Sequence, residues 1–525
     1  MAIRISDGMT RRSLLRSAAT ASLALGGGLA LPAYSRAATR PQFPNGVQSG
    51  DIAADRGVMW VRADRPSKAF IEWSTTESFA DVHRLPALDA LPETDHAVKI
   101  LATGLPSDQD IFWRATLADL SDINTVSEPI VGYFKTAPTQ KRDIVFTWSG
   151  DTVGQGWGID EARGGMKIYD TMLKTRPDFF IHSGDNIYAD GPIKEEVDLA
   201  DGTKWKNVVT EAKAKVAETL GEFRGQYHYN MMDRNVQAHN AAIPMLTQWD
   251  DHEVSNNWSA SKQLDERYAE RSVFQLAANA ARAFHEMMPI ATSLDEPQRV
   301  YRKVAYGPML DVFFLDMRTY RGPNGDNLET EINENSRFLG DDQRAWLKRE
   351  LKASKATWKI IAADMPLALV VWDNFNAQKG FEAVSNNEPG KPLGRELEFA
   401  DLLKFIKDET IANTVWLTAD VHYTAAHYYN PEKAAFQDFD PFWEFVSGPL
   451  HAGTFGPGEL DQTFGPELKY VKAPTAEQGQ NLSPAMGLQF FGQVNIAADS
   501  EVMTVALKDV AGDTLWSIDL DPKKA

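Results

Sequence analysis

Six short apolar runs between residues 144 and 417 each end at, or a few residues before, an aspartate. Stretches with helical periodicity separate several of the runs, and this alternation predicts an α/β domain with a largely parallel or mixed sheet. Ligands of open α/β sheets bind beyond the carboxyl ends of the strands, so these carboxylates are expected together at one edge. The aspartates are Asp151, Asp185, Asp250 with Asp251, Asp316, Asp364 and Asp420.

Helices of this domain are expected at residues 165–174, 262–288 and 341–353. Two late runs, 489–495 and 503–507, have the pattern of strands and are expected to complete a sheet.

The region from Phe43 to Pro138 has a different pattern, with short runs in which apolar and polar residues alternate. Such runs suit strands with one buried face, and about 95 residues of them predict a β-sandwich. A proline and small polar residues at 136–139 favour a short linker, which sets the predicted domains at residues 40–138 and 142–525. Strands are expected at 57–63, 69–75, 96–101, 110–117 and 130–136.

The charge balance and the lack of cysteine exclude several classes of function. The net charge is −19, so no broad basic face is expected for a nucleic-acid backbone. With no cysteine in the chain, disulfides, thiolate metal sites and cysteine nucleophiles are excluded together. Any metal must therefore bind to Asp, Glu, His, Asn, Tyr or backbone oxygen.

The first 37 residues have the order of a secretory signal peptide. A paired Arg11-Arg12 precedes the apolar stretch Ala18–Leu31, and small residues follow at Ala33–Ala37. The alternative of a membrane helix is disfavoured because the apolar stretch is short and contains three glycines, 26–28. The paired arginines resemble a twin-arginine signal. Export by the twin-arginine machinery to a periplasmic or secreted location is therefore expected, with no transmembrane segment in the mature protein.

Each strand-end aspartate, taken alone, is best explained as a turn residue or a helix cap. Four or more carboxylates at one sheet edge cannot all stay ionised without cations, because burial of unpaired like charges is too costly. Oxygen ligands with a few histidines suit Ca²⁺, Mg²⁺, Mn²⁺ or oxidised iron. Tyr188 lies beside them in sequence and favours a trivalent ion that binds phenolate.

Five segments, taken in order, resemble the PhoD-like alkaline phosphatase/phosphodiesterases of the metallophosphoesterase superfamily. The segments are Gly46–Asp51, Gly132–Pro138, His182–Tyr188, Trp249–Asn257 and Thr418–Tyr423. The resemblance implies an α/β (α+β) fold, a four-layer metallophosphoesterase-type sandwich preceded by a fibronectin-like β-sandwich. It also implies an exported binuclear-metal hydrolase that acts on small-molecule or lipid phosphate esters.

The resemblance assigns roles to individual positions of this chain. Asp185 would bridge the two metals, and Tyr188 and His422 would bind the trivalent iron. Asp420, with either Asp251 or Asn256, would hold the second ion, expected to be Ca²⁺, with Mn²⁺ or Mg²⁺ as alternatives. His252 would contact the phosphate or the leaving group.

The chain departs from the family at the first motif, which usually reads Ser-Cys-Gln and supplies a cysteine to the iron. This chain has Trp148–Thr152 there. Asp151 is the expected substitute ligand, while Thr152 is an alternative that would place the phosphate or the nucleophile. A carboxylate in place of a thiolate makes the site harder. The expected catalytic set is therefore His252, Asp185 and Asp151.

Two alternatives to the phosphatase function remain: a phospholipase D-like phosphodiesterase, and a non-catalytic surface protein in which the metals only stabilise the fold. Among the weaker site candidates, His182 is better explained by packing, and His427 and His451 by positions in polar loops or helices. Four more residues follow a predicted strand, and they either line the predicted metal site or form structural salt bridges. They are Asp316, Arg318, Tyr320 and Arg321.

Overall fold

The computed structural model describes residues 39–388 and 390–523. The signal peptide expected at residues 1–37 lies outside this range, so nothing in the structure bears on it.

Two large β-sheets form the centre of the second region. The first is a nine-stranded sheet in the order β26-β25-β24-β10-β11-β14-β1-β2-β6, and the second is a seven-stranded sheet in the order β15-β16-β17-β20-β22-β21-β23. β10, β11 and β14 are parallel, as are β16, β17, β20 and β22. In the first sheet the bounds are β10 Ile144–Ser149, β11 Phe179–Ser183, β14 Met245–Gln248, β24 Phe490–Ile496, β25 Met503–Asp509 and β26 Thr514–Leu520. In the second they are β15 Arg302–Ala305, β16 Leu310–Phe314, β17 Trp358–Ala362, β20 Thr414–Thr418, β21 Thr424–Tyr429, β22 Phe442–Val446 and β23 Pro466–Lys472.

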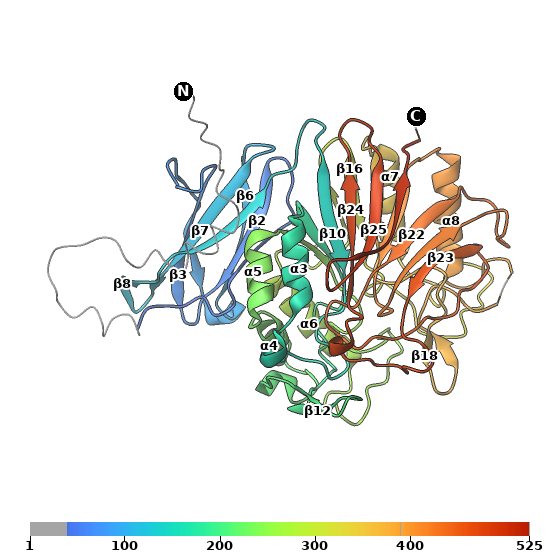
Figure 1. Ribbon diagram of the computed structural model, residues 1–525, viewed down its shortest axis with the longest axis horizontal. Helices are drawn as coiled ribbons and strands as arrows, with labels where there is room; N and C mark the ends of the chain where they lie inside the picture. Colours follow the sequence, from blue (N-terminus) through green and yellow to red (C-terminus); the bar gives the residue numbers. More distant parts are fainter. Residues whose placement is uncertain (1–38, 389, 524–525) are drawn as a thin grey trace.

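Helices cover the outer face of each sheet, which gives four layers (Figure 1). Alternate strand residues build the layers: Phe179 and Ile181 of β11 join the core between the sheets, whereas Phe180 packs under the helices. The helices over the nine-stranded sheet are α3 Lys167–Thr175, α4 Leu220–Asn230, α5 Arg234–Ala242 and α6 Val273–Met287. Those over the seven-stranded sheet are α7 Asp341–Ala353 and α8 Glu396–Asp408. The expected four-layer α/β sandwich is therefore confirmed, as are the late strands β24 and β25.

The helix expected over 262–288 is confirmed only in its second half. The Ser272 side chain accepts a hydrogen bond from the Gln275 amide and so caps α6, which begins at Val273. The preceding residues form a loop, in which the Arg271 guanidinium donates to the Asp265 carbonyl. This loop contributes Lys262 and Gln263 to the wall of a cavity described below. Two small hairpins lie outside the main sheets: β12 Glu196–Asp198 with β13 Lys204–Lys206, and β18 Trp372–Asn374 with β19 Lys379–Phe381.

The N-terminal region is a β-domain, and all five strands expected there are present. One of its sheets is not separate from the rest of the molecule, because β1 pairs in parallel with β14 through Gly50 and Met245. The hydrophobic core is likewise continuous from this domain into the space between the two large sheets. The strands are β1 Val47–Gly50, β2 Arg56–Arg62, β3 Ser67–Ser74, β4 His83–Arg84, β5 Leu88–Ala90, β6 Ala97–Thr103, β7 Asp110–Asp119, β8 Asp122–Val126 and β9 Ile130–Lys135.

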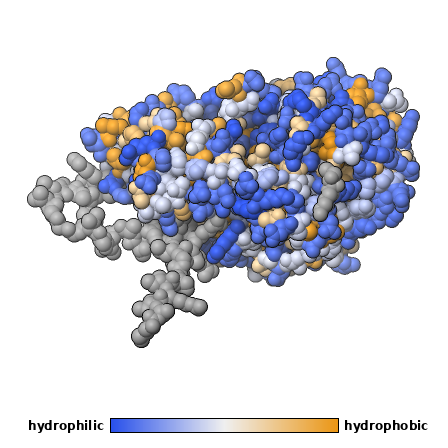
Figure 2. Space-filling model, turned by 90° about the horizontal axis from the view of Figure 1, so that it is seen from above, coloured by the Kyte–Doolittle hydropathy of each residue, from blue (hydrophilic) through white to orange (hydrophobic). Residues whose placement is uncertain are grey.

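Hydrophilic residues cover most of the face seen in Figure 2, and apolar patches there are small and scattered. Within residues 39–388 and 390–523, no helix has the length and apolar character needed to cross a bilayer.

Candidate metal centre

The loops that follow β10, β11 and β20 carry a strained backbone at the expected metal ligands. The φ angles are +71° at Asp151, +51° at Asp185, +66° at Asp420 and +59° at His422. Residues with a Cβ rarely adopt this region, and such strain is concentrated at functional sites. The first two loops hold one another, because the Thr152 amide donates to the Asp185 carbonyl over 2.9 Å.

Two glycines leave room for these loops. A Cβ at Gly184 would lie 2.5 Å from the Asp250 Cβ, so only glycine lets the β11 loop approach the β14 loop. A Cβ at Gly448 would lie 2.2 Å from Asp151 Oδ2 and would fill the space beside that carboxylate.

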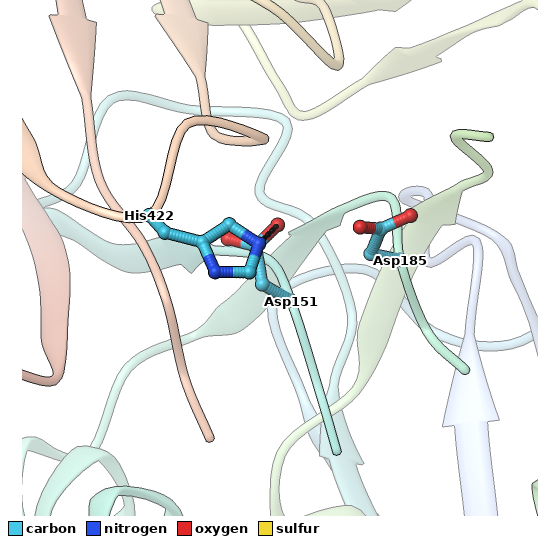
Figure 3. Close-up of side chains that lie close together, drawn as sticks. All are labelled: Asp151, Asp185 and His422. Carbon is cyan, nitrogen blue, oxygen red and sulfur yellow. Dashed lines mark ion pairs between the residues drawn. The ribbon is translucent and has the colours of Figure 1, made fainter. Parts of the chain in front are cut away.

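The side chains of Asp151, Asp185 and His422 converge from both sheets (Figure 3). The His422 Nε2 atom is 3.6 Å from Asp151 Oδ1 and accepts a hydrogen bond of 2.7 Å from the Tyr188 hydroxyl. Nδ1 on the other side of the imidazole donates to the Gly453 carbonyl. Burial lowers the pKa of His422 to about 4, so the imidazole is neutral. The lone pair of Nε2 is then available to a metal ion.

Two further groups of possible ligands continue from the first: the second shares Asp185 with it, and the third shares Asp251 with the second. Asp185 also lies with Asp251 and His252, and Asp251 lies with Asp250 and Asp420. In each group the candidate ligand atoms are within 4.8 Å of one another. Asp185 is therefore common to two neighbouring groups, which is the position that a bridging ligand requires.

The free oxygens of these carboxylates fit a metal. Both carboxylate oxygens of Asp151, Oδ2 of Asp185 and Oδ1 of Asp251 are buried without a hydrogen-bond partner in the described part of the chain. Burial, together with the neighbouring carboxylates, raises the pKa of Asp151, Asp185 and Asp420 well above the ordinary value. Ionised groups in such a place need a cation beside them.

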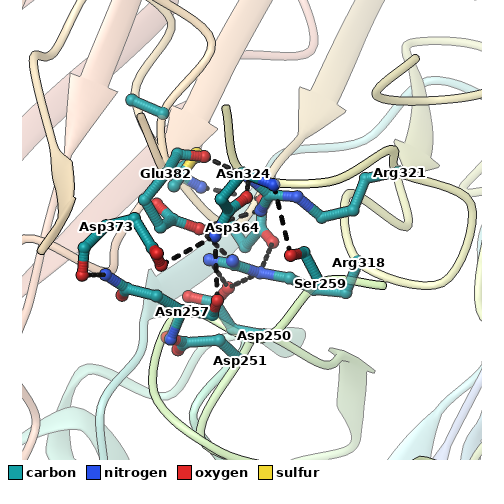
Figure 4. Close-up of polar contacts among 12 residues, drawn as sticks. Asp250, Asp251, Asn257, Ser259, Arg318, Arg321, Asn324, Asp364, Asp373 and Glu382 are labelled. Atoms are coloured by element: carbon teal, nitrogen blue, oxygen red, sulfur yellow. Dashed lines mark hydrogen bonds and ion pairs between the residues drawn. The ribbon is translucent and has the colours of Figure 1, made fainter. Parts of the chain in front are cut away.

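Asp250 differs from Asp151, Asp185 and Asp251 because it is paired with a buried cation, Arg318 (Figure 4). The Arg318 Nε atom donates to Asp250 Oδ1 over 2.6 Å and to Asp364 Oδ2 over 3.2 Å. The same guanidinium bonds Glu382, which also pairs with Arg321. Of the two explanations open for Arg318 and Arg321, the structure therefore supports structural salt bridges.

His252 stands at the side of the centre with its imidazole fixed. Nδ1 donates to Asp190 Oδ1 over 2.7 Å, and the ring packs on Tyr188 with 4.2 Å between centroids. The His252 amide donates to Asp185 Oδ1 over 3.1 Å. Burial lowers the pKa of His252, but the carboxylates of Asp190, Asp251 and Asp185 outweigh it and hold that pKa well above its ordinary value.

Asn256 and Thr152 lie in different surroundings. Asn256 is exposed on the cavity wall, and its amide donates to Asp190 Oδ2 over 2.8 Å. Thr152 is buried, with its hydroxyl 3.1 Å from His182 Nε2 and 3.0 Å from the Tyr169 hydroxyl, so it is part of the packed interior.

The remaining candidates have structural partners. His427 and His451 are buried rather than on polar loops: His427 contacts Glu444 over 2.9 Å, and His451 donates to the Gly158 carbonyl. Asp316 accepts from the Trp249 indole, and the Tyr320 hydroxyl donates to Glu296.

Sequence reasoning missed two supporting carboxylates. Asp190 holds both the His252 ring and the Asn256 amide. Glu253 accepts from the amides of Asp185 and Asp250, so it ties the β11 loop to the β14 loop. Each lies within or next to a recognised segment, two residues after Tyr188 and two after Asp251.

A cavity of about 820 Å³ opens over the centre. Its wall includes Asp185, Asp251, His252, Asp420 and His422. A second cavity of about 390 Å³ adjoins it on the side of Tyr188 and Asp190. Apart from Asp151, which lines neither cavity, the candidate ligands are therefore accessible to a solute.

Comparisons with known proteins agree with this geometry. The PhoD-like phosphatase family model matches residues 146–507, and the model of the PhoD-like phosphatase N-terminal domain matches residues 28–138. Alkaline phosphatase D of Bacillus subtilis (strain 168) is 30% identical over 438 residues, which cover 79% of this chain and 70% of the relative.

Two solved structures share the fold. A structure of PhoD superposes with a TM-score of 0.66 at 21% identity and covers 92% of each chain. The purple acid phosphatase PPD1 from yellow lupin (Lupinus luteus) seeds superposes with a TM-score of 0.56 at 12% identity, over 92% of this chain and 74% of the other. With both family models matched along the chain, and with buried carboxylates gathered where their strands end, the chain belongs to the PhoD-like phosphatase family.

Proposed function

We propose that this protein is a metal-dependent hydrolase of phosphate esters, an alkaline phosphatase or phosphodiesterase of the PhoD type. The observation that carries the proposal is a set of buried carboxylate oxygens, on Asp151, Asp185 and Asp251, that have no hydrogen-bond partner among the described residues. They lie at strand ends of the nine-stranded sheet, next to an open cavity that Asp420 and His422 from the seven-stranded sheet also line. A purely structural metal site would not need a cavity of this size above its ligands.

The metal ligands are assigned in two groups. Asp151, Tyr188 and His422 hold the first ion, proposed to be Fe³⁺, because a phenolate and a carboxylate are hard anionic ligands. Asp251 and Asp420 hold the second, proposed to be Ca²⁺, and Asp185 is shared. Asn256 on the cavity wall is a further oxygen donor for the second ion. Mn²⁺ or Mg²⁺ at these positions would suit the same oxygen-rich set.

When bound, such ions lower the pKa of water and neutralise phosphoryl oxygens. The chain itself supplies orientation. Because Asp190 holds the Nδ1 proton of His252, the opposite Nε2 edge is fixed, and it hydrogen-bonds a phosphoryl or leaving-group oxygen. Asp185 holds the His252 amide, so the imidazole and the shared carboxylate keep a constant separation.

Export is part of the proposal and rests on residues 1–37 alone. The paired Arg11-Arg12 assign the chain to the twin-arginine route and to a periplasmic or secreted location. Cell fractionation of wild-type and of a form with both arginines changed to lysine tests this: the exported form should be lost in the variant.

Hydrolysis of 4-nitrophenyl phosphate and of bis(4-nitrophenyl) phosphate, before and after chelation, tests the function. Turnover should be lost on chelation and restored by metal. Elemental analysis of the pure protein identifies the ions. Preference for the bis-substituted ester would favour the phosphodiesterase alternative, and bound metal with no turnover of either ester would favour the non-catalytic one.

Asp185→Asn tests the shared ligand. Loss of one negative charge next to both ions should reduce metal content and lower turnover by about 100-fold or more. The fold should survive, because the variant removes a buried unpaired charge. Asp499→Asn, an exposed residue in the loop between β24 and β25, is the matched control. Near-normal turnover of Asp185→Asn with full metal content would contradict the assignment.

A further inference from the structure

The hairpin β18–β19 forms one side of the large cavity. Trp372, Asp373, Asn374, Phe375 and Asn376 all line it. Phe375 is 79% exposed, although a phenyl ring is among the costliest groups to leave in water. The apolar surface continues inward from the tip through Val371 and Leu369.

The hairpin is held in place relative to the metal ligands. The Asn257 side-chain amide donates to the carbonyls of Trp372 and Asp373, over 3.3 Å and 3.2 Å. The backbone amide of Asn257 in turn donates to Asp251. The Asn324 side chain adds a second tie, donating to Asp373 Oδ1 over 2.9 Å. The position of the hairpin is therefore coupled to that of a candidate ligand.

Trp372 is held in place by a ring on the other strand of the hairpin. Its ring packs on Phe381 with 4.2 Å between centroids, so the indole has one face covered by the hairpin itself. Trp372 keeps part of its surface on the cavity side, where it is half-buried. The indole of Trp372, the first residue of β18, and the exposed phenyl ring of Phe375, in the turn after β18, therefore line the same side of the cavity.

The cavity is polar at its base and apolar along this side. Asp185, Asp251 and His422 are buried, whereas Phe375 is exposed, so the aromatic surface lies farther out than these ligands. Val421, Tyr423 and Phe455 add apolar surface to the same cavity. Its volume of about 820 Å³ is far larger than a phosphate group, and the space beyond the ligands must hold the esterified alcohol.

We propose that Phe375 and Trp372 form a specificity-determining aromatic wall, which packs against a ring-bearing apolar alcohol of the phosphate ester. This inference rests on the proposed function, because the phosphate must be held at the carboxylate centre for its alcohol to reach the wall. Phe375 makes no contact with the reacting atoms. It acts on the affinity for the ester and not on bond cleavage.

Binding of two non-hydrolysable probes tests the wall. Isothermal titration of the metal-loaded protein with phenylphosphonate and methylphosphonate should show tighter binding of the phenyl probe. Phe375→Ala should weaken phenylphosphonate about 3- to 10-fold and leave methylphosphonate unchanged, the range that one aromatic contact gives. Phe375→Trp should retain the preference. Phe274→Ala is the matched control, since Phe274 is a 62% exposed phenylalanine on α6 that lines neither cavity over the centre.

Steady-state kinetics supply the second readout. With 4-nitrophenyl phosphate, Phe375→Ala should raise KM about 3- to 10-fold with kcat nearly constant, and with glycerol 2-phosphate both constants should stay as in the wild type. Equal weakening of both phosphonates, or an unchanged phenyl preference in Phe375→Ala, would overturn the wall while the hydrolase remains. A wild-type protein that binds neither probe and cleaves neither ester would refute the proposed function, and the wall with it.

Discussion

The hydrogen bonds of His252 determine which of its atoms can contact a substrate. Its Nδ1 is occupied by Asp190 and its amide by Asp185, so only the Nε2 edge is available to a substrate. His252→Ala should therefore lower kcat by about 10²- to 10⁴-fold, the usual contribution of a positioned imidazole, with the metals still bound. Elemental analysis beside the kinetics checks this. Loss of metal from the variant would show that His252 is itself a ligand.

Tyr188 tests the identity of the first ion. Its hydroxyl is buried 2.7 Å from His422 Nε2, beside Asp151 and Asp185. A phenolate on Fe³⁺ produces a visible charge-transfer band, so the pure protein should be coloured, and Tyr188→Phe should lose the band. Part of the metal should remain on Asp151, Asp185 and His422. A colourless, fully active wild type would exclude Fe³⁺ and leave the hydrolase proposal intact.

The sequence pattern located Asp151, Asp185, Asp251 and Asp420 because each follows a strand, and strand ends meet in this fold. It did not identify Asp190 and Glu253, whose importance lies in bonds to residues on other loops. Periodicity says nothing of such partners. Asn256 belongs to a recognised segment: its backbone amide donates to Asp190 and the residue lies on the cavity wall, while its role as a ligand stays a prediction.

At the scale of elements, six strands were expected to end in a carboxylate, and all six are present. Only some of these carboxylates reach the cavity. Asp316 turns to the Trp249 indole, and Asp364 turns to Arg318. The sequence cannot distinguish these cases, since the partner that captures each carboxylate comes from a distant loop.

Helix α8 carries a buried carboxylate that should make stability depend on pH. Burial, reinforced by Asp461, raises the pKa of Glu396 to about 8. Above the ordinary pKa, Glu396 ionises in the unfolded chain but keeps its proton in the folded protein. The free energy of unfolding therefore falls as the pH rises from the ordinary pKa toward 8. Relative to Glu396→Gln, the wild type should lose up to about 1.4 kcal/mol of unfolding free energy per pH unit in that window.

Denaturant unfolding of both proteins at pH 5, 6.5 and 8 measures this difference. The exposed Glu432→Gln serves as the control and should show no such divergence. A constant difference between wild type and Glu396→Gln across the three pH values would contradict the raised pKa.

At the scale of the whole molecule, the β-domain and the larger region share one sheet and one core. The indole of Trp60 donates to the Glu286 carbonyl, and the Lys99 ammonium donates to the His285 carbonyl, so strands of the β-domain also bond to the end of α6. Sequence patterns place a boundary near residue 138 because strand-like alternation gives way there to apolar runs separated by helical stretches. They cannot show pairing between β1 and β14, which are almost 200 residues apart.

A part-buried ion pair joins the two regions. Arg302 on β15 donates to Asp51 over 2.6 Å, and Asp51 also accepts from the Ala291 amide. Asp51→Asn would remove the carboxylate that pairs with the part-buried Arg302, which keeps only the Thr247 and Val300 carbonyls as acceptors. The variant should lose about 1–3 kcal/mol of unfolding free energy. Because the core is continuous, calorimetry should record one transition for both proteins, lower in temperature for the variant. Two separate transitions in the wild type, or loss of the β-domain alone in Asp51→Asn, would show that the regions fold independently despite the shared sheet.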